Sequence, residues 1–196
     1  MILNFIDRKL IFKDFIEGKK VLDVGCLGNG SITDFHQFVE DNASYTLGID
    51  INESLINKAK SKWNVIYGNA ENYIANEKFD VIVASEILEH LSNPGNFFEC
   101  SYKNLKDGGI LILSTPNSFG IHYILNKIRK TELINIEHVC WYDEFTLKNF
   151  AARYGFCFVM SQFVDLTSNY IKKITLKFFP DLADTIIIVF QKISAK

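Results

Sequence analysis

Short apolar runs alternate with longer amphipathic segments between residues 20 and 115. Alternation of this kind predicts repeated strand and helix units around a parallel sheet. Apolar residues at helical spacing predict two helices that cover the sheet, with Ser31 and Asn52 as their N-caps. The expected strands lie at residues 21–24, 45–49, 64–67, 79–84 and 110–114, and the helices at 31–40 and 53–62.

After Pro116 the alternation loosens, but no linker rich in Pro, Gly or Ser appears. We therefore expect a single domain over residues 1–196, with helices at 119–130 and 143–154 and strands at 156–163 and 185–191 that extend the same sheet. Residues 170–179 form a short, basic, amphipathic segment. Its apolar stripe is expected to pack on the sheet, in preference to a membrane surface or a lipid-linked substrate.

Composition and charge narrow the classes of function. The chain has 196 residues, 48% apolar and 22% charged, with a formal charge of -2. Such a charge disfavours nucleic acid as a partner. The four cysteines form no C-x-x-C pair, so we expect reduced thiols in a cytoplasmic protein and no metal site. No apolar run resembles a signal peptide or is long enough for stable membrane insertion.

Glycines follow the first predicted strand, at Gly25, Gly28 and Gly30. Three glycines within six residues let the backbone turn tightly and approach a nucleotide-sized ligand, although a purely structural strand-to-helix turn is the alternative. The spacing G-x-x-G-x-G differs from the dinucleotide fingerprint G-x-G-x-x-G. The loop also lacks the Lys-Ser/Thr ending of a P-loop.

Two carboxylates lie near this loop in the predicted sheet. Asp50 closes the second strand, where it could accept hydrogen bonds from both hydroxyls of a ribose; its alternative role is to cap the helix that begins near Glu53. Asp23 ends the first strand. A cationic, zwitterionic ligand such as a sulfonium amino acid would be attracted to this pair, unlike an anionic pyrophosphate.

Five ordered segments, of which this glycine loop is the first, resemble the class I S-adenosylmethionine-dependent methyltransferases. They are VLDVGCLGNG at 21–30, GID at 48–50, GNAE at 68–71, FDVIVASEILEHL at 79–91, and LKDGG at 105–109 with its following strand to STPN at 114–117. A looser likeness, EHVCWY at 137–142 and the helix after it, is to methyltransferases of small-molecule and glycan biosynthesis.

The resemblance implies a doubly wound, Rossmann-like α/β fold. Its seven-stranded sheet has the order 3-2-1-4-5-7-6 with the last strand antiparallel and helices on both faces. The part of the domain from about residue 18 to residue 117 would bind S-adenosylmethionine. The part from about residue 118 to residue 196 would bind the acceptor and form a lid. The resemblance places these residues at the cofactor: Asp23, Gly25, Cys26, Gly28, Gly30, Asp50, Ile51, Asn69, Ala70, Glu71, Ser85, Glu86 and His90.

The chain departs from the family at Leu27, where glycine is usual, so the loop is expected to carry one extra residue or to hold the methionine portion differently. Asn69 stands where the acid at the adenine edge is often Asp, so it can accept or donate a hydrogen bond but carries no charge.

Methyl transfer from a sulfonium is an in-line displacement, so the enzyme mainly aligns the reactants and excludes water. A hydroxyl acceptor also needs a base, for which His90 and His138 are the candidates. Glu86 and Glu89 are expected to begin a solvated helix rather than to pair with a cation. The aromatic residues that could line an acceptor pocket, or instead belong to the core, are Phe119, Trp141 and Tyr142.

The sequence therefore predicts a methyltransferase that acts on a small molecule or a glycan precursor, with an oxygen acceptor favoured over a nitrogen acceptor. The protein is expected to be a monomer or a homodimer. Two alternatives stay open: an NAD-dependent oxidoreductase, in which Asp50 binds the ribose of NAD, and a non-catalytic module that binds S-adenosylmethionine.

Overall fold

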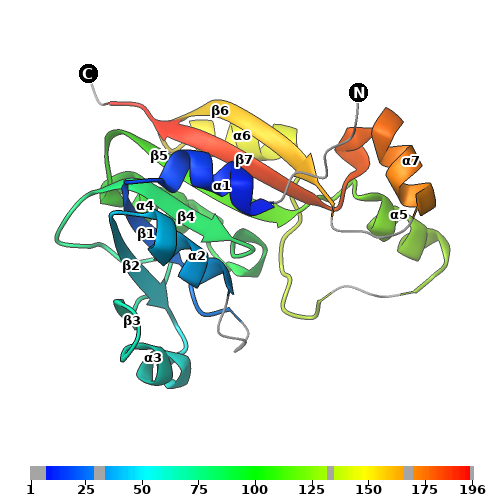
Figure 1. Ribbon diagram of the computed structural model, residues 1–196. Helices are drawn as coiled ribbons and strands as arrows, with labels where there is room; N and C mark the ends of the chain where they lie inside the picture. Colours follow the sequence, from blue (N-terminus) through cyan, green and yellow to red (C-terminus); the bar gives the residue numbers. More distant parts are fainter. Residues whose placement is uncertain (1–7, 29–33, 132–134, 166–169, 195–196) are drawn as a thin grey trace.

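A single mixed sheet of seven strands runs through the described part of the chain, which in this computed structural model is residues 8–28, 34–131, 135–165 and 170–194. The order is β3-β2-β1-β4-β5-β7-β6 (Figure 1). The first five strands are parallel, and β7 is antiparallel to both β5 and β6. The predicted order and the antiparallel last strand are confirmed. The strands are β1 (Lys20–Val24), β2 (Tyr45–Asp50), β3 (Val65–Tyr67), β4 (Phe79–Ser85), β5 (Leu105–Pro116), β6 (Phe156–Val164) and β7 (Thr185–Lys192).

Helices cover both faces of the sheet, as predicted (Figure 1). Side chains of α1 and α2 pack on one face, and those of α4 and α6 on the other. The helices are α1 (Arg8–Ile16), α2 (Asp34–Asn42), α3 (Glu53–Ala59), α4 (Pro94–Asn104), α5 (Ile121–Ile128), α6 (Glu144–Ala152) and α7 (Tyr170–Phe178), with 3-10 turns η1 (Leu88–His90) and η2 (Pro180–Leu182).

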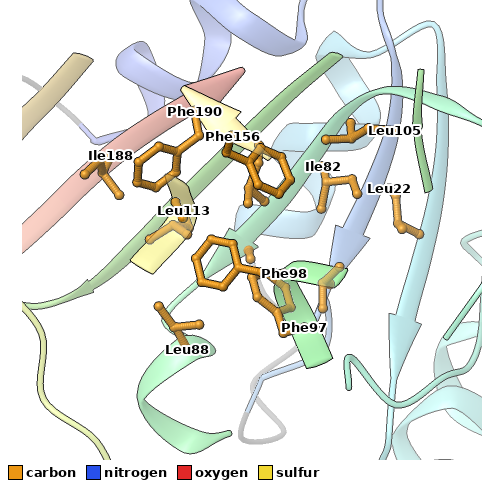
Figure 2. Close-up of a cluster of buried hydrophobic side chains, with 14 of the residues drawn as sticks. Leu22, Ile82, Leu88, Phe97, Phe98, Leu105, Leu113, Phe156, Ile188 and Phe190 are labelled. Atoms are coloured by element: carbon orange, nitrogen blue, oxygen red, sulfur yellow. The ribbon is translucent and has the colours of Figure 1, made fainter. Parts of the chain in front are cut away.

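Side chains of successive residues in β1 enter two different cores, because neighbouring side chains of a strand point to opposite faces. Val21 packs with Phe12 of α1, whereas Leu22 belongs to the larger cluster. In that cluster Phe98 of α4 contacts Phe190 of β7, among other rings (Figure 2). Complete burial of each such side chain contributes roughly 1.5–3 kcal/mol to the stability of the fold. This packing holds the strands in place and so positions the loops at the carboxyl edge of the sheet.

Two helices were missing from the sequence prediction. Four of the nine residues of α1 are charged, which obscures its apolar pattern, and α4 begins with the turn formers Pro94 and Gly95. Pro94 lies in the first turn of α4, where its missing N–H costs nothing. Asn52 is confirmed as the N-cap of α3, since its side chain accepts from the N–H of Leu55 at 3.1 Å. The predicted cap Ser31 lies outside the described residues.

The basic amphipathic segment forms α7, but its apolar stripe does not pack as predicted. Leu176 is buried, whereas Ile174 and Phe178 are exposed. The expectation of a stripe packed on the sheet is therefore wrong for these two side chains. Within the described residues, no helix combines the length and the apolar character needed to cross a bilayer.

Candidate functional site

A cavity of about 880 Å³ opens at the carboxyl ends of β1, β2 and β4. In doubly wound sheets this edge is where ligands bind. Most of the residues assigned to the cofactor from sequence line it, and both candidate bases do too. These residues are Gly25, Gly28, Asp50, Ile51, Asn69, Ala70, Glu71, Ser85, Glu86, His90 and His138. Gly30 lies outside the described residues.

The glycine loop takes a backbone course that side chains disfavour. Gly25 and Gly28 have φ values of 69° and 52°, in the left-handed region. A Cβ on Gly25 would overlap the side chain of Ile87. The N–H groups of Gly25 and Cys26 both donate to the carbonyl of Ile49, at 2.8 and 3.2 Å, and so tie the loop to β2.

Leu27, which replaces the usual glycine, does not fill the cavity. Its side chain is 2% exposed and packs in a small cluster with Ile56, Ala59 and Trp63. The backbone N–H of Leu27 donates to Oδ2 of Asp50 at 3.0 Å. The side chain that departs from the family pattern is thus accommodated in the hydrophobic core beneath α3. Cys26, which was assigned to the cofactor, belongs to the same buried cluster and does not line the cavity.

Asp50 joins the glycine loop to the loop after β2. Its Oδ2 accepts from Leu27, and its Oδ1 accepts from the N–H of Asn52 at 2.9 Å. Because Asn52 itself caps α3, the capping role considered for Asp50 is wrong. Each carboxylate oxygen can accept more than one hydrogen bond, so Asp50 keeps capacity for a ligand hydroxyl at the cavity wall.

Asp23 points away from the cavity, toward α2. Its Oδ2 lies 2.7 Å from Nδ1 of the buried His36, and Nε2 of His36 lies 3.6 Å from Oε1 of Glu40. Burial raises the pKa of Asp23. The structure therefore does not place this carboxylate where it was predicted, among the groups facing the ligand; it belongs to a buried network beneath the glycine loop. Sequence reasoning missed His36, although its position in the helix expected at 31–40 was the available signal.

The polar residues predicted at the adenine edge mainly organise their own loop. Oδ1 of Asn69 accepts from the N–H of Glu71 at 2.9 Å. The carboxylate of Glu71 accepts from the backbone N–H and the side-chain Nδ2 of Asn93, at 3.0 and 3.1 Å, and these bonds lower the pKa of Glu71. Ala70 and the exposed Ile51 supply apolar surface at the same wall.

The exit of β4 carries the most perturbed carboxyl group of the cavity. Glu89 is 1% exposed, and its Oε2 accepts from Oγ1 of Thr115 at 3.0 Å. Its Oε1 has no hydrogen-bond partner within the described residues. Burial, reinforced by the charge of Glu86, raises the pKa of Glu89 to about 8. Glu86 has a φ of 54° and an ion pair with Arg8 at 3.8 Å. The expectation that these two acids begin a solvated helix is wrong.

The two candidate bases, far apart in sequence, meet at the cavity. The rings of His90 and His138 contact edge to face with centroids 4.7 Å apart. The loop of His138 is held by the N–H groups of Val139 and Cys140, which donate to the carbonyl of Glu89 at 2.9 and 3.2 Å. Burial, and then the nearby His90, lower the pKa of His138, so its imidazole stays neutral and able to accept a proton near neutral pH.

Glu89, His90 and His138 also bring one potential ligand atom each within 4.8 Å of one another. Three such ligands are the number that a catalytic zinc site uses, although the sequence indicated no metal. The expectation that the protein has no metal site therefore stays a prediction.

The three aromatic residues considered for an acceptor pocket have other positions. Tyr142 is part of the large core, and Phe119 is exposed. The ring of Trp141 contacts Tyr123 of α5 at 4.6 Å. Sequence reasoning instead missed several lining residues without a distinctive chemical signature, among them Ile87, Leu91, Asn135 and Glu137.

The residues present fit S-adenosylmethionine. The cavity volume is in the range of small-molecule sites. Asp50 offers a carboxylate for ribose hydroxyls, and the glycine turn brings backbone close to the ligand. Glu86, at the exit of β4, lines the cavity and offers a carboxylate on the wall where a sulfonium would bind.

A family model described as a methyltransferase domain matches residues 4–160. The chain belongs to this methyltransferase family. The predicted resemblance to S-adenosylmethionine-dependent methyltransferases is confirmed, together with the cofactor it implied. The methyltransferase core thus accounts for the sheet and for the cavity at its carboxyl edge.

Curated relatives of this methyltransferase include enzymes named ubiquinone biosynthesis O-methyltransferase. The one from Coxiella burnetii is 30% identical over 145 residues, which are 65% of this chain and 58% of the relative. The mitochondrial one from Rattus norvegicus is 32% identical over 133 residues, 62% of this chain and 37% of the relative. The chain therefore matches only part of the length of these relatives.

Solved structures show the same fold. A SAM-dependent methyltransferase from Archaeoglobus fulgidus superposes with a TM-score of 0.71 at 21% identity, covering 94% of this chain and 91% of the other. Magnesium protoporphyrin IX methyltransferase from Synechocystis, crystallised with SAH, gives 0.64 at 16% identity and covers 93% of this chain and 78% of the other.

Proposed function

We propose that the protein transfers a methyl group from S-adenosylmethionine to a hydroxyl oxygen of a small-molecule acceptor. The observation that carries this proposal is the pair His90 and His138 on the cavity wall, with the pKa of His138 lowered. A hydroxyl loses its proton as its oxygen is methylated, so it needs a neutral base within reach. The relatives named O-methyltransferases support the same chemistry.

Each group of the cavity has a part in this proposal. S-adenosylmethionine, when bound, supplies the electrophilic methyl group. Asp50 accepts hydrogen bonds from the ribose and fixes the cofactor against the glycine loop. His138 accepts the acceptor's proton on its imidazole, and His90 packs against that ring and holds it at the cavity. Glu89 anchors the loop of His138 through its main-chain carbonyl.

Membership of the methyltransferase family speaks against the NAD-dependent alternative. No contact among the described residues favours a glycan precursor over another hydroxyl compound. A non-catalytic module would bind S-adenosylmethionine without transferring its methyl group. Methyl transfer that falls in variants of His90 and His138 therefore separates an enzyme from such a module.

The test measures transfer of a labelled methyl group to a panel of phenols, catechols, sugar nucleotides and amines. We expect a hydroxyl compound to be methylated, and His138→Ala to lower kcat by about 10²–10⁴-fold. The variant should leave the Kd of S-adenosylhomocysteine within about twofold, because the base acts on the acceptor. The matched control is His122→Ala, which removes an exposed histidine of α5 outside the cavity. Methylation of amines alone, or full kcat in both His138→Ala and His90→Ala, would refute the proposal.

A further inference from the structure

Helix α5 exposes most of its apolar residues and buries a polar one. Its apolar residues follow helical spacing at Ile121, Ile124, Leu125 and Ile128. Yet the buried side chain of α5 is Asn126, while Ile128 is 71% exposed and Ile124 and Leu125 are also exposed. A helix of a globular protein normally turns its apolar stripe to the core. The apolar face of α5 is therefore available to a partner.

Helix α7 adds a second apolar surface next to the first. Asp184 joins the two helices, since its Oδ1 accepts from the N–H of His122 in α5 and its Oδ2 pairs with Lys172 of α7. Figure 1 shows both helices at the same end of the molecule, away from α3. On α7 and just after it, Ile174, Phe178 and Phe179 are exposed.

The loop at the rim of the cavity contributes to the same region. Asn135, Glu137 and His138 line the cavity, whereas Ile136 is 96% exposed and Val139 is also exposed. Trp141, two residues after this loop, links it to α5, since its ring contacts that of Tyr123 in α5 and lies 6.3 Å between centroids from that of His138. The cavity rim thus adjoins the exposed apolar helices.

The charged residues of helices α5 and α7 are all basic, whereas the loop 135–139 carries the acidic Glu137 at the cavity. Neither α5 nor α7 contains an acidic residue. Lys127, Arg129, Lys130 and Lys177 are exposed, and within the described residues none of them has an ion pair. Exposed apolar residues flanked by lysine and arginine are typical of helices that lie in the interface of an anionic bilayer.

We propose that α5, α7 and the loop 135–139 form a docking surface for the anionic face of a lipid bilayer. A second copy of the chain fits less well, because a two-fold contact would set the cations of α5 against each other with no acid on either helix to pair with them. The protein would bind peripherally, because side chains of two short helices contact the bilayer surface. This contact would bring the cavity rim to the lipid headgroups. It goes beyond the proposed methyl transfer and does not depend on it.

The test is co-sedimentation of the full chain with vesicles of phosphatidylcholine, with and without phosphatidylglycerol. We expect binding to the anionic vesicles that weakens as salt rises, because the lysines and arginines are screened. Ile128→Asp and Phe178→Asp should each lower the bound fraction by at least about tenfold. Lys127→Gln should lower it by about fivefold.

The matched control is Leu10→Asp, which makes the same kind of change at an exposed position of α1. It should bind vesicles as the wild type does, and circular dichroism should show that all variants are folded. Failure of the folded wild type to bind anionic vesicles at low salt would overturn the proposal. So would equal binding by Ile128→Asp, or a dimer that Ile128→Asp converts to monomer in light scattering.

Discussion

The buried carboxyl group of Glu89 should make the stability of the fold fall as the pH rises. Burial holds the pKa of Glu89 at about 8, above its ordinary value of 4.5. Between these two values the folded protein retains a proton that the unfolded chain has lost, so stability decreases with increasing pH. For one such group the loss amounts to about 3 kcal/mol between about pH 5.5 and about pH 8.

Glu89→Gln removes this titration and changes little else. The side chain has nearly the same shape, and its amide oxygen can still accept from Thr115. Urea unfolding of both proteins at the two pH values gives the free energies. Asp23, Glu40 and His138, whose pKa values are also shifted, titrate in both proteins, so the difference between the proteins isolates Glu89. A chelator in every sample keeps metal ions from contributing.

We expect Glu89→Gln to lose less stability than the wild type over this range, by about 3 kcal/mol. Equal losses in the two proteins would refute the reasoning, because they would mean that Glu89 already ionises in the folded state as freely as in the unfolded chain.

Two further substitutions test the glycine loop. Gly25→Ala should cost about 1–2 kcal/mol of stability for a left-handed backbone, and more from overlap with Ile87; a loss under about 0.5 kcal/mol in urea unfolding would contradict this. Leu27→Ala should cost about 2–5 kcal/mol because it empties a buried site. Its Kd for S-adenosylhomocysteine should stay within about twofold, since the backbone N–H to Asp50 remains, and a much larger change would show that the side chain reaches the ligand.

The sheet and most of the cavity could be predicted because their signals are local. The glycines at 25 and 28 and the acid at 50 follow strands whose ends must meet at one edge of a parallel sheet. The contact between His90 and His138 could not be predicted, because it depends on main-chain hydrogen bonds from a distant loop to the carbonyl of Glu89. The spacing of apolar residues along the sequence gives no information about such main-chain hydrogen bonds.

The sequence also did not predict which individual side chains are buried, because this depends on tertiary packing. Glu89 resembles a solvated first turn in sequence, yet the approach of Thr115 and the loop after residue 138 buries it. The apolar residues of α5 follow helical spacing, yet the buried side chain of this helix is Asn126. A hydrophobic pattern identifies a face but not the partner that covers it.

The most direct test is calorimetric titration of S-adenosylhomocysteine into the wild type and Asp50→Asn. We expect one site per chain in the wild type. In Asp50→Asn we expect binding to weaken by about 10- to 150-fold, the loss that corresponds to one charge-assisted hydrogen bond. Absence of binding to folded wild type, or equal affinity in the folded variant, would contradict the claim that the cavity beside Asp50 holds the cofactor.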